Sequence, residues 1–311
     1  MSITIFSNIF INDPIKLEIL KISFSSFNQA NISQWLLNIR GKYKLEAIQY
    51  LKKNISQEVI FFELNSEEGW FYDARIMSEK LNSEYIFLWL EDHANISDND
   101  YFNSVVSDMH KTSSDCLLYS AFFFGEQIKS FDNCPTKQTE NIIFCDYSLD
   151  LHQKRIKNID NILPINKSKN IKYNKYKASS YIINMPSIFS KKMFLKILEN
   201  NDLLFKRWSK MTPFDFEKRE TDISWLPIRT ALPKREFFAT IDDNHGYIGY
   251  SLIERQHPLI KTILKIQNKI MPNYVEKNDR TGFFINLVKK LKDKANYLYN
   301  VYMYLKKKLN E

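Results

Sequence analysis

Short apolar runs alternate with amphipathic helical patterns through the first 125 residues, and this order constrains the fold more than any other feature of the chain. The runs have the length of strands, and the segments between them carry apolar residues at helical spacing. Strands that alternate with helices form βαβ units with parallel strands and right-handed crossovers. We therefore predict an α/β fold. The expected strands are 3–6, 35–39, 59–64, 85–90 and 116–124, and the expected helices are 14–27, 43–53, 70–81 and 101–110.

The first predicted helix has a clear start. Asn12 and Asp13 offer capping side chains, and Pro14 follows at the first helical position, where proline is favoured. We expect this helix to bury the face made by Ile15, Ile19, Ile22 and Ser26.

The alternation weakens in the second half of the chain. We expect loops and short elements over residues 130–178, a strand at 181–185 and a helix at 190–199. Residues 211–256 are rich in acids, aromatics and proline, and no internal repeat is evident.

Basic charge is concentrated in the C-terminal tail, residues 259–311. The chain carries a net charge of +8, and the tail alone holds twelve Lys and Arg against four Asp and Glu, so residues 1–258 are neutral. A neutral body argues against a nucleic-acid groove in the main domain. The tail also carries an apolar stripe at alternating spacings of four and three, which is typical of one helix face. The stripe consists of Phe284, Val288, Leu291, Ala295, Leu298, Tyr302, Leu305 and Leu309.

Three interpretations of this tail stay open. It packs onto the main domain, it associates with a second copy, or it lies on an anionic membrane surface, which its Lys and Tyr residues suit. No apolar run approaches the roughly 20 residues that span a bilayer, and the N-terminus lacks the pattern of a signal peptide. The three cysteines form no CxxC pair, which favours reduced thiols. We expect a cytoplasmic protein, peripheral on the inner face of the cytoplasmic membrane if the tail contacts lipid.

The predicted strand 85–90 ends in Glu91, Asp92 and His93. The strand is a continuous apolar run, which is typical of a strand buried on both faces of a parallel sheet. Ligands of such sheets bind beyond the carboxyl ends of the strands. The sequence therefore predicts a site for a charged ligand, with or without a cation, at these three residues.

The segment ARIMSEKLNSEYIFLWLEDH, residues 74–93, resembles the donor-binding segment of bacterial, family-two-like glycosyltransferases with the A-type (GT-A) fold. In that family an Ala-Arg pair opens a helix, a Gly-Glu-Tyr-Ile-like turn precedes a strand, and an Asp-X-Asp motif follows. Ala74 and Arg75 occupy the first place, residues 83–86 the second, and Glu91 lies sixteen positions after Arg75. The resemblance covers residues 1–125 and implies a Rossmann-type mixed sheet flanked by helices.

The resemblance also implies roles for the cluster. In the family the first acid contacts ribose or sugar, and the last acid binds a divalent cation that neutralises the diphosphate. Glu91 and Asp92 would face the donor, and His93 would stand at the metal position. The implied cofactor is Mn²⁺ or Mg²⁺, and imidazole suits Mn²⁺ better than Mg²⁺. A polar strand end with Glu91 paired to a lysine is the alternative interpretation.

Three further residues are donor-binding candidates. Asn8 and Asn65 follow the first and third predicted strands, and Asn8 falls where the family holds the nucleotide base. Arg75 is placed to approach a phosphate or ribose, or else to pack its stem on Trp70 or Phe71 at the surface.

A group of acids in residues 212–227, TPFDFEKRETDISWLP, offers a catalytic base. An inverting transferase needs a carboxylate to take the proton from the acceptor hydroxyl. The family places that base at a helix start a hundred or more residues after the Asp-X-Asp motif, and Glu217 follows Glu91 by 126 positions. Asp215 and Glu220 are alternative bases. The alternative interpretation is that these acids lie at the N-terminus of a helix, where the helix dipole favours negative charge.

A polar turn follows the apolar run that begins at Phe237. Some members of the family complete their metal site with a histidine from a C-terminal segment, and His245 matches that role, with Asp243 as a ligand or its hydrogen-bond partner. A hairpin turn rich in Asp, Asn and Gly is the alternative interpretation.

Taken with the resemblance, these features predict a hexosyl- or related transferase that moves a sugar from a nucleotide-sugar donor to a growing surface glycan, on a free or lipid-linked acceptor. We expect residues 1–125 to bind the donor, 126–258 to form the acceptor side of the same domain, and 259–311 to form the helical tail. The alternative hypothesis is a degenerate transferase fold that serves as a binding or scaffold protein, tethered by the tail.

Overall fold

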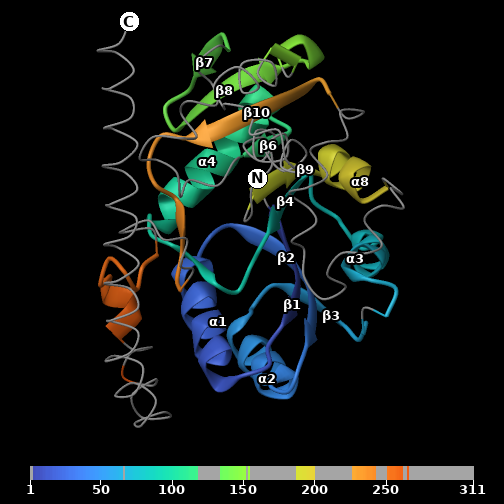
Figure 1. The fold of residues 1–311 in the computed structure, drawn as a ribbon, viewed down its shortest axis with the longest axis vertical. Helices are drawn as coiled ribbons and strands as arrows, with labels where there is room; N and C mark the ends of the chain where they lie inside the picture. The colour runs from blue at the N-terminus through green and yellow to red at the C-terminus, as the bar shows by residue number, and fades with distance from the viewer. Residues whose placement is uncertain are drawn as a thin grey trace, which may run out of the picture. The chain divides into compact units, whose positions relative to one another are not determined.

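The computed structural model describes residues 3–65, 67–117, 134–151, 153–154, 187–199, 226–242, 251–261 and 265. Over these residues the chain forms a nine-stranded mixed sheet flanked by helices, together with a two-stranded sheet (Figure 1). The predicted α/β class with a mixed sheet is confirmed. The chain divides into two compact units, Met1–Ile260 and Lys261–Glu311, and the predicted tail helix lies outside the described residues.

The strands of the main sheet lie in the order β3-β2-β1-β4-β9-β6-β10-β8-β7. These strands are β1 (Ile3–Phe10), β2 (Ile32–Arg40), β3 (Glu58–Phe62), β4 (Tyr85–Leu88), β6 (Cys116–Leu117), β7 (Thr136–Gln138), β8 (Ile142–Tyr147), β9 (Ser187–Ser190) and β10 (Ile228–Pro233). The small sheet pairs β5 (His93–Asn95) with β11 (Phe238–Thr240). The helices are α1 (Pro14–Phe27), α2 (Lys44–Asn54), α3 (Trp70–Ser78), α4 (Asn99–Thr112), α8 (Lys191–Glu199) and the short η6 (Pro258–Ile260).

The first four strands in sequence are parallel to one another. β1 pairs with β2 on one side and with β4 on the other, and β2 pairs with β3. Beyond β4 the sheet becomes mixed, because β9 runs antiparallel to both β4 and β6. The carboxyl ends of β1, β2 and β4 therefore meet at one edge of the sheet.

Alternating side chains divide the core into two hydrophobic layers. Ile5 of β1 belongs to the layer covered by α1, α2 and α4, whereas Phe6 belongs to the layer covered by α3 and α8. Successive strand residues point to opposite faces, so a continuous apolar strand serves both layers. Figure 1 shows α3 and α8 side by side, in agreement with their packing against each other.

The predicted start of α1 is confirmed, but of the four residues on the predicted face only Ile19 is buried. Asp13 caps the helix by accepting a hydrogen bond from Lys16 N at 2.9 Å, and Pro14 is the first helical residue. Ile15, Ile22 and Ser26 are only partly buried. The helix is apolar on most sides, so spacing alone did not select the face, which is fixed by aromatic packing against Trp35 and Trp89. The buried residues are Leu17, Ile19, Leu20, Ser23, Phe24 and Phe27.

Other predicted boundaries differ in ways that packing explains. α3 ends at Ser78 rather than at 81, and Leu81 stays buried through a tight turn in which its N–H donates to Ser78 O at 3.2 Å. The apolar spacing thus continues past the end of the helix. β4 ends at Leu88, although Trp89 N still donates to Phe6 O at 2.9 Å.

The second half of the chain was predicted less completely. The helix at 190–199 is confirmed as α8, and β7 and β8 lie among the short elements expected over 130–178. β10 and β11 were not predicted as strands. Most of the predicted strand 116–124 and all of the predicted strand 181–185 lie outside the described residues.

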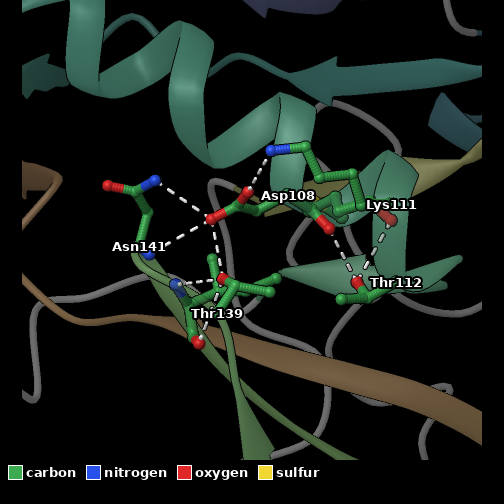
Figure 2. A network of polar contacts seen from close by, with 7 residues as sticks. Asp108, Lys111, Thr112, Thr139 and Asn141 are labelled. Atoms are coloured by element: carbon green, nitrogen blue, oxygen red, sulfur yellow. Dashed lines mark hydrogen bonds and ion pairs between the residues drawn. The ribbon is translucent and has the colours of Figure 1, made fainter.

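Asp108 ties α4 to the turn between β7 and β8 (Figure 2). One carboxylate oxygen accepts from Thr139 Oγ1 at 2.6 Å and from the backbone and side-chain nitrogens of Asn141 at 3.1 and 3.0 Å. The other accepts from Lys111 Nζ at 3.1 Å. Burial alone would raise the pKa of Asp108, but these hydrogen bonds outweigh it and hold the pKa below its ordinary value.

Gly41 shapes the turn that follows β2. Its φ is +99°, and a Cβ at this position would meet the carbonyl carbon of Ile11 at 2.7 Å. Ile11 N donates to Arg40 O at 2.8 Å, and Tyr43 N donates to Ile11 O at 3.0 Å. These bonds hold the chain after β2 against the chain after β1, and only glycine fits between them.

Gly41→Ala is expected to destabilise the fold by about 2 to 4 kcal/mol, because it adds a backbone clash to the strain of a positive φ. Gly69→Ala is the matched control, since Gly69 has a similar φ of +104° but open space where its Cβ would be. Urea denaturation measures both free energies of unfolding. Equal losses in the two variants would show that the contact with Ile11 does not constrain the turn.

Candidate functional site

Polar side chains meet where β1 and β2 end at the carboxyl edge of the sheet. Asn8 and Asn38 are direct neighbours in the parallel pairing of the two strands. Asn8 Oδ1 accepts from Asn38 Nδ2 at 3.0 Å and from Arg40 Nε at 3.2 Å. All three residues are buried, and we call them, with Asp73 and Glu91, the edge cluster.

The amide of Asn8 has one orientation that satisfies this network. Two donors point at its Oδ1, so its Nδ2 is the free end of the amide. That Nδ2 is buried and finds no hydrogen-bond acceptor among the described residues. A buried donor without an acceptor costs about 1–3 kcal/mol, which makes Asn8 Nδ2 a candidate donor to a bound ligand.

Asn38 connects the edge cluster to the segment between β3 and α3. Its Oδ1 accepts from Leu64 N at 3.0 Å, and its Nδ2 also donates to Leu64 O at 3.1 Å. At the start of α3, Trp70 Nε1 donates to Asn8 O at 2.9 Å. The carboxyl ends of β1, β2 and β3 are thus joined through two amides and an indole.

Arg40 is the cation of the edge cluster. Its side chain is 7% exposed, and burial lowers its pKa, while the negative fields of Asp73 and Glu91 oppose that shift. Asp73, in the first turn of α3, is 3% exposed. The two acids thus offset part of the charge of this buried cation.

Glu91 lies just beyond β4, next to this cation. Burial and the neighbouring Asp92 raise its pKa to about 7, against the opposing effect of Lys16 and His93. The carboxyl group therefore carries its proton part of the time near neutral pH, and in that form it can donate as well as accept a hydrogen bond.

Asp92 and His93 form a pair. His93 Nδ1 lies 2.6 Å from Asp92 Oδ1, and the imidazole is 6% exposed whereas the carboxylate is 36% exposed. Burial would raise the pKa of Asp92, but His93 outweighs it and lowers the pKa. Ser23 of α1 donates to the backbone carbonyl of His93 and accepts from Trp89 Nε1 at 2.7 Å, which fixes the chain after β4 on α1.

The described residues contain no group of three or more His, Cys, Asp and Glu side chains that could hold a metal ion. Asp92 and His93 supply two such side chains, and these two are hydrogen-bonded to each other. The fit of these two residues to Mn²⁺ or Mg²⁺ is therefore incomplete, since such ions take several oxygen ligands.

The predicted partners Asp243 and His245 lie outside the described residues, but both flanks of their segment are described. Ile241 N donates to Asp92 O at 2.7 Å, and Leu252 N donates to Thr240 O at 2.9 Å. The chain thus leaves and re-enters the described structure beside Asp92.

The other predicted site residues have separate surroundings. Asn65 is exposed, and its Oδ1 accepts from Glu67 N at 3.0 Å in a local turn. Arg75 Nη1 donates to Leu198 O of α8 at 3.4 Å, so its described hydrogen bond lies with α8 and not with the edge cluster. The three candidate bases Asp215, Glu217 and Glu220 lie outside the described residues.

Sequence analysis missed Asn38, Arg40 and Asp73. A signal for the first two was present, because they stand at the end of the predicted strand 35–39, where ligands of parallel sheets bind. Asp73 gave no such signal, since an acid in the first turn of a helix is favoured by the dipole alone.

No protein-family model and no curated protein matches the sequence. Solved structures do match at low identity. S. aureus TarS 1-349 in complex with UDP-GlcNAc is 12% identical over 86% of this chain and 67% of that one, with a TM-score of 0.45. The mannosyltransferase PcManGT from Pyrobaculum calidifontis, in complex with GDP-Man and Mn²⁺, is 10% identical over 85% and 63%, with a TM-score of 0.40. A nucleotidyl transferase from Methanothermobacter thermautotroptrophicus is 8% identical over 76% and 88%, with a TM-score of 0.40. The chain thus spans about two thirds of the length of the TarS fragment.

Glu91→Gln is expected to stabilise the protein above pH 7 and to lose that advantage as the pH falls. The folded pKa, about 7, lies above the ordinary value of 4.5, so the wild type gains stability as Glu91 takes up its proton on acidification. The amide that replaces the carboxyl group in the variant does not titrate. We expect the variant to be more stable by about 1 to 2 kcal/mol at pH 8 and equal to the wild type near pH 4.5.

Urea denaturation at a series of pH values checks this expectation. Glu46→Gln on the exposed surface of α2 is the matched control for the change from carboxyl to amide itself. A stability difference for Glu91→Gln that is flat with pH would show that the carboxyl group is not held near Asp92 in a buried environment.

Proposed function

We propose that this protein is a glycosyltransferase that binds a nucleotide-sugar at the edge cluster and transfers the sugar to an acceptor of a bacterial surface glycan. The observation that carries the proposal is the buried Nδ2 of Asn8, which finds no acceptor among the described residues, at the carboxyl edge where the parallel strands β1, β2 and β4 end. Ligands bind at this edge in open α/β sheets. The resemblance of residues 74–93 to the donor-binding segment of A-type glycosyltransferases supports the same conclusion.

In this proposal the nucleotide base lies against Asn8, with Asn8 Nδ2 donating to an acceptor on the base. Asn38 and Arg40 hold the Asn8 amide in that orientation through its Oδ1. A rigid amide loses little freedom when the ligand binds, which favours affinity.

Glu91 and Asp92 face the ribose and the sugar side of the donor. Glu91 accepts or donates a hydrogen bond according to its proton, which suits hydroxyl groups. A divalent cation, if bound at Asp92 with His93, Asp243 or His245, would neutralise the charge that develops on the leaving diphosphate. The proposal includes these metal-binding roles, and it includes Arg75 and Asn65 as residues that bind the nucleotide-sugar.

The acceptor hydroxyl needs a base in an inverting transfer. Glu217 is the proposed base, with Asp215 and Glu220 as its alternatives, and one of these carboxylates would take the hydroxyl proton as the sugar transfers. The basic, apolar-striped tail suits an anionic membrane surface. A tail bound there would keep the protein at the membrane that holds a lipid-linked acceptor. None of the described helices is long and apolar enough to cross a membrane.

Isothermal titration of the full chain with UDP-, GDP-, CDP- and dTDP-sugars, with and without Mn²⁺, tests the proposal. We expect one nucleotide class to bind, and we expect Asn8→Asp to weaken that binding about 10- to 100-fold, because the donor at Nδ2 becomes an acceptor. Asn54→Asp makes the same chemical change at the exposed end of α2 and should bind like the wild type. Circular dichroism verifies that Asn8→Asp folds.

Two results would contradict the proposal in different ways. Equal binding by Asn8→Asp and the wild type would place the nucleotide elsewhere on the protein. Absence of binding by every nucleotide, with and without Mn²⁺, would favour the alternative of a binding or scaffold protein built on a transferase fold.

A further inference from the structure

All three cysteines of the chain lie together, far along the sheet order from the edge cluster. Cys116 of β6 and Cys145 of β8 belong to the hydrophobic layer under α3 and α8, and Cys134 packs against the same layer. Thr230 of β10 pairs in register with Cys116 on one side and with Cys145 on the other. Residues that are directly opposite across paired strands share a face of the sheet, so the two thiols flank Thr230.

The three thiols differ in their surroundings. Cys116 is fully buried, and its Sγ donates to Thr230 Oγ1 at 3.4 Å. Cys145 is 2% exposed and is hydrogen-bonded to the thiol of Cys134, which is only partly buried. This hydrogen bond, and then burial, raise the pKa of Cys145, and Cys134 is the more accessible of the two thiols.

The hairpin that carries Cys134 and Cys145 is fixed at its other end. Thr136 of β7 pairs with Cys145 of β8, and the turn between these strands is bound to α4 through Asp108 (Figure 2). The two thiols are in contact on a hairpin whose turn is held in place, and a disulfide between them must meet the narrow geometry of that bond.

We propose that Cys134 and Cys145 are a dithiol that low-molecular-weight disulfides oxidise to an intramolecular disulfide. The Cys134 thiolate attacks the small disulfide and forms a mixed disulfide, releasing one small thiolate. Cys145 then loses its proton to solvent and attacks the Cys134 sulfur, which releases the second small thiolate. Two protein thiols are oxidised, and one small disulfide is reduced to two thiols.

Cys116 has no part in this reaction. Its thiol donates to Thr230 Oγ1, whereas the thiol of Cys145 contacts Cys134, the sulfur that is attacked in the second step. The product ties β7, the edge strand of the main sheet, covalently to β8. The proposal stands independently of the proposed function.

The test uses the full chain, reduced and then incubated under native conditions with glutathione disulfide as the probe. Remaining thiols are alkylated in denaturant, and the protein is digested with trypsin and analysed without reduction. Cleavage after Lys111, Lys129, Lys137 and Lys154 puts each cysteine on a separate peptide. We expect the peptides 130–137 and 138–154 to appear joined, and the Cys116 peptide 112–129 to appear alkylated.

Two variants sharpen the result. Cys116→Ser should still give the joined peptides, whereas Cys134→Ser should lose them and leave Cys145 alkylated. Because Cys134 is only partly buried, this variant is expected to fold, and circular dichroism verifies it. The peptide pattern of the oxidised wild type tests the proposal without either variant, so the test remains valid if a variant misfolds.

Three outcomes would overturn the proposal. They are a disulfide that includes Cys116, a mixed glutathione disulfide that persists on Cys134 while Cys145 stays free, and three alkylated cysteines after prolonged incubation.

Discussion

The parallel pairing of β1 with both β2 and β4 is the constraint on which the rest of the structure depends. It brings the ends of three strands to one edge, and it places Asn8 opposite Asn38 in register. The hydrogen bonds of Asn38 and Arg40 to Asn8 Oδ1 follow from that register. A shift of one residue would turn these side chains to the opposite face of the sheet and into the apolar layers.

Charge balance at this edge depends on burial. Arg40 is a buried cation near Asp73 and Glu91, and Glu91 in turn lies beside Asp92, whose carboxylate is paired with His93. Removing Arg40, the cation of the cluster, would leave its buried acids without that compensating charge, which costs more than the pair itself contributes. The cluster is therefore a coupled unit, and Asn8 Nδ2 is its unused hydrogen-bond donor.

The sequence predicted the parallel half of the fold well, because continuous apolar runs and the Asn12-Asp13-Pro14 start are strong local signals. It also predicted that Glu91, Asp92 and His93 lie at the carboxyl edge. It did not predict the buried face of α1, since Ile15 and Leu17 are equally apolar and only contacts with distant strands distinguish them. β10 and β11 were missed for a related reason: they are short and are defined by pairing with strands about 80 to 145 residues earlier in the chain.

Within the site, the network of Asn38, Arg40 and Asp73 could not be assembled from local patterns. Each of these residues is ordinary in its own segment, and their proximity follows from the order of the strands and the position of α3. The pairing of Asp92 with His93 likewise depends on the exit of the chain from β4 and its attachment to Ser23 of α1. The sequence thus predicted the position of Glu91, Asp92 and His93 beyond β4, whereas their contacts and those of Asn8 are known only from the structure.

Hydrogen–deuterium exchange of the full chain, compared with and without a sugar nucleotide of the proposed donor class, tests the central claim most directly. Binding at the edge cluster predicts slower exchange at the carboxyl ends of β1, β2 and β4 and just beyond them, in residues 9–13, 39–43 and 89–93. The outer strands β7 and β8 should exchange as in the free protein. Protection confined to other segments, with these three unchanged, would contradict the account.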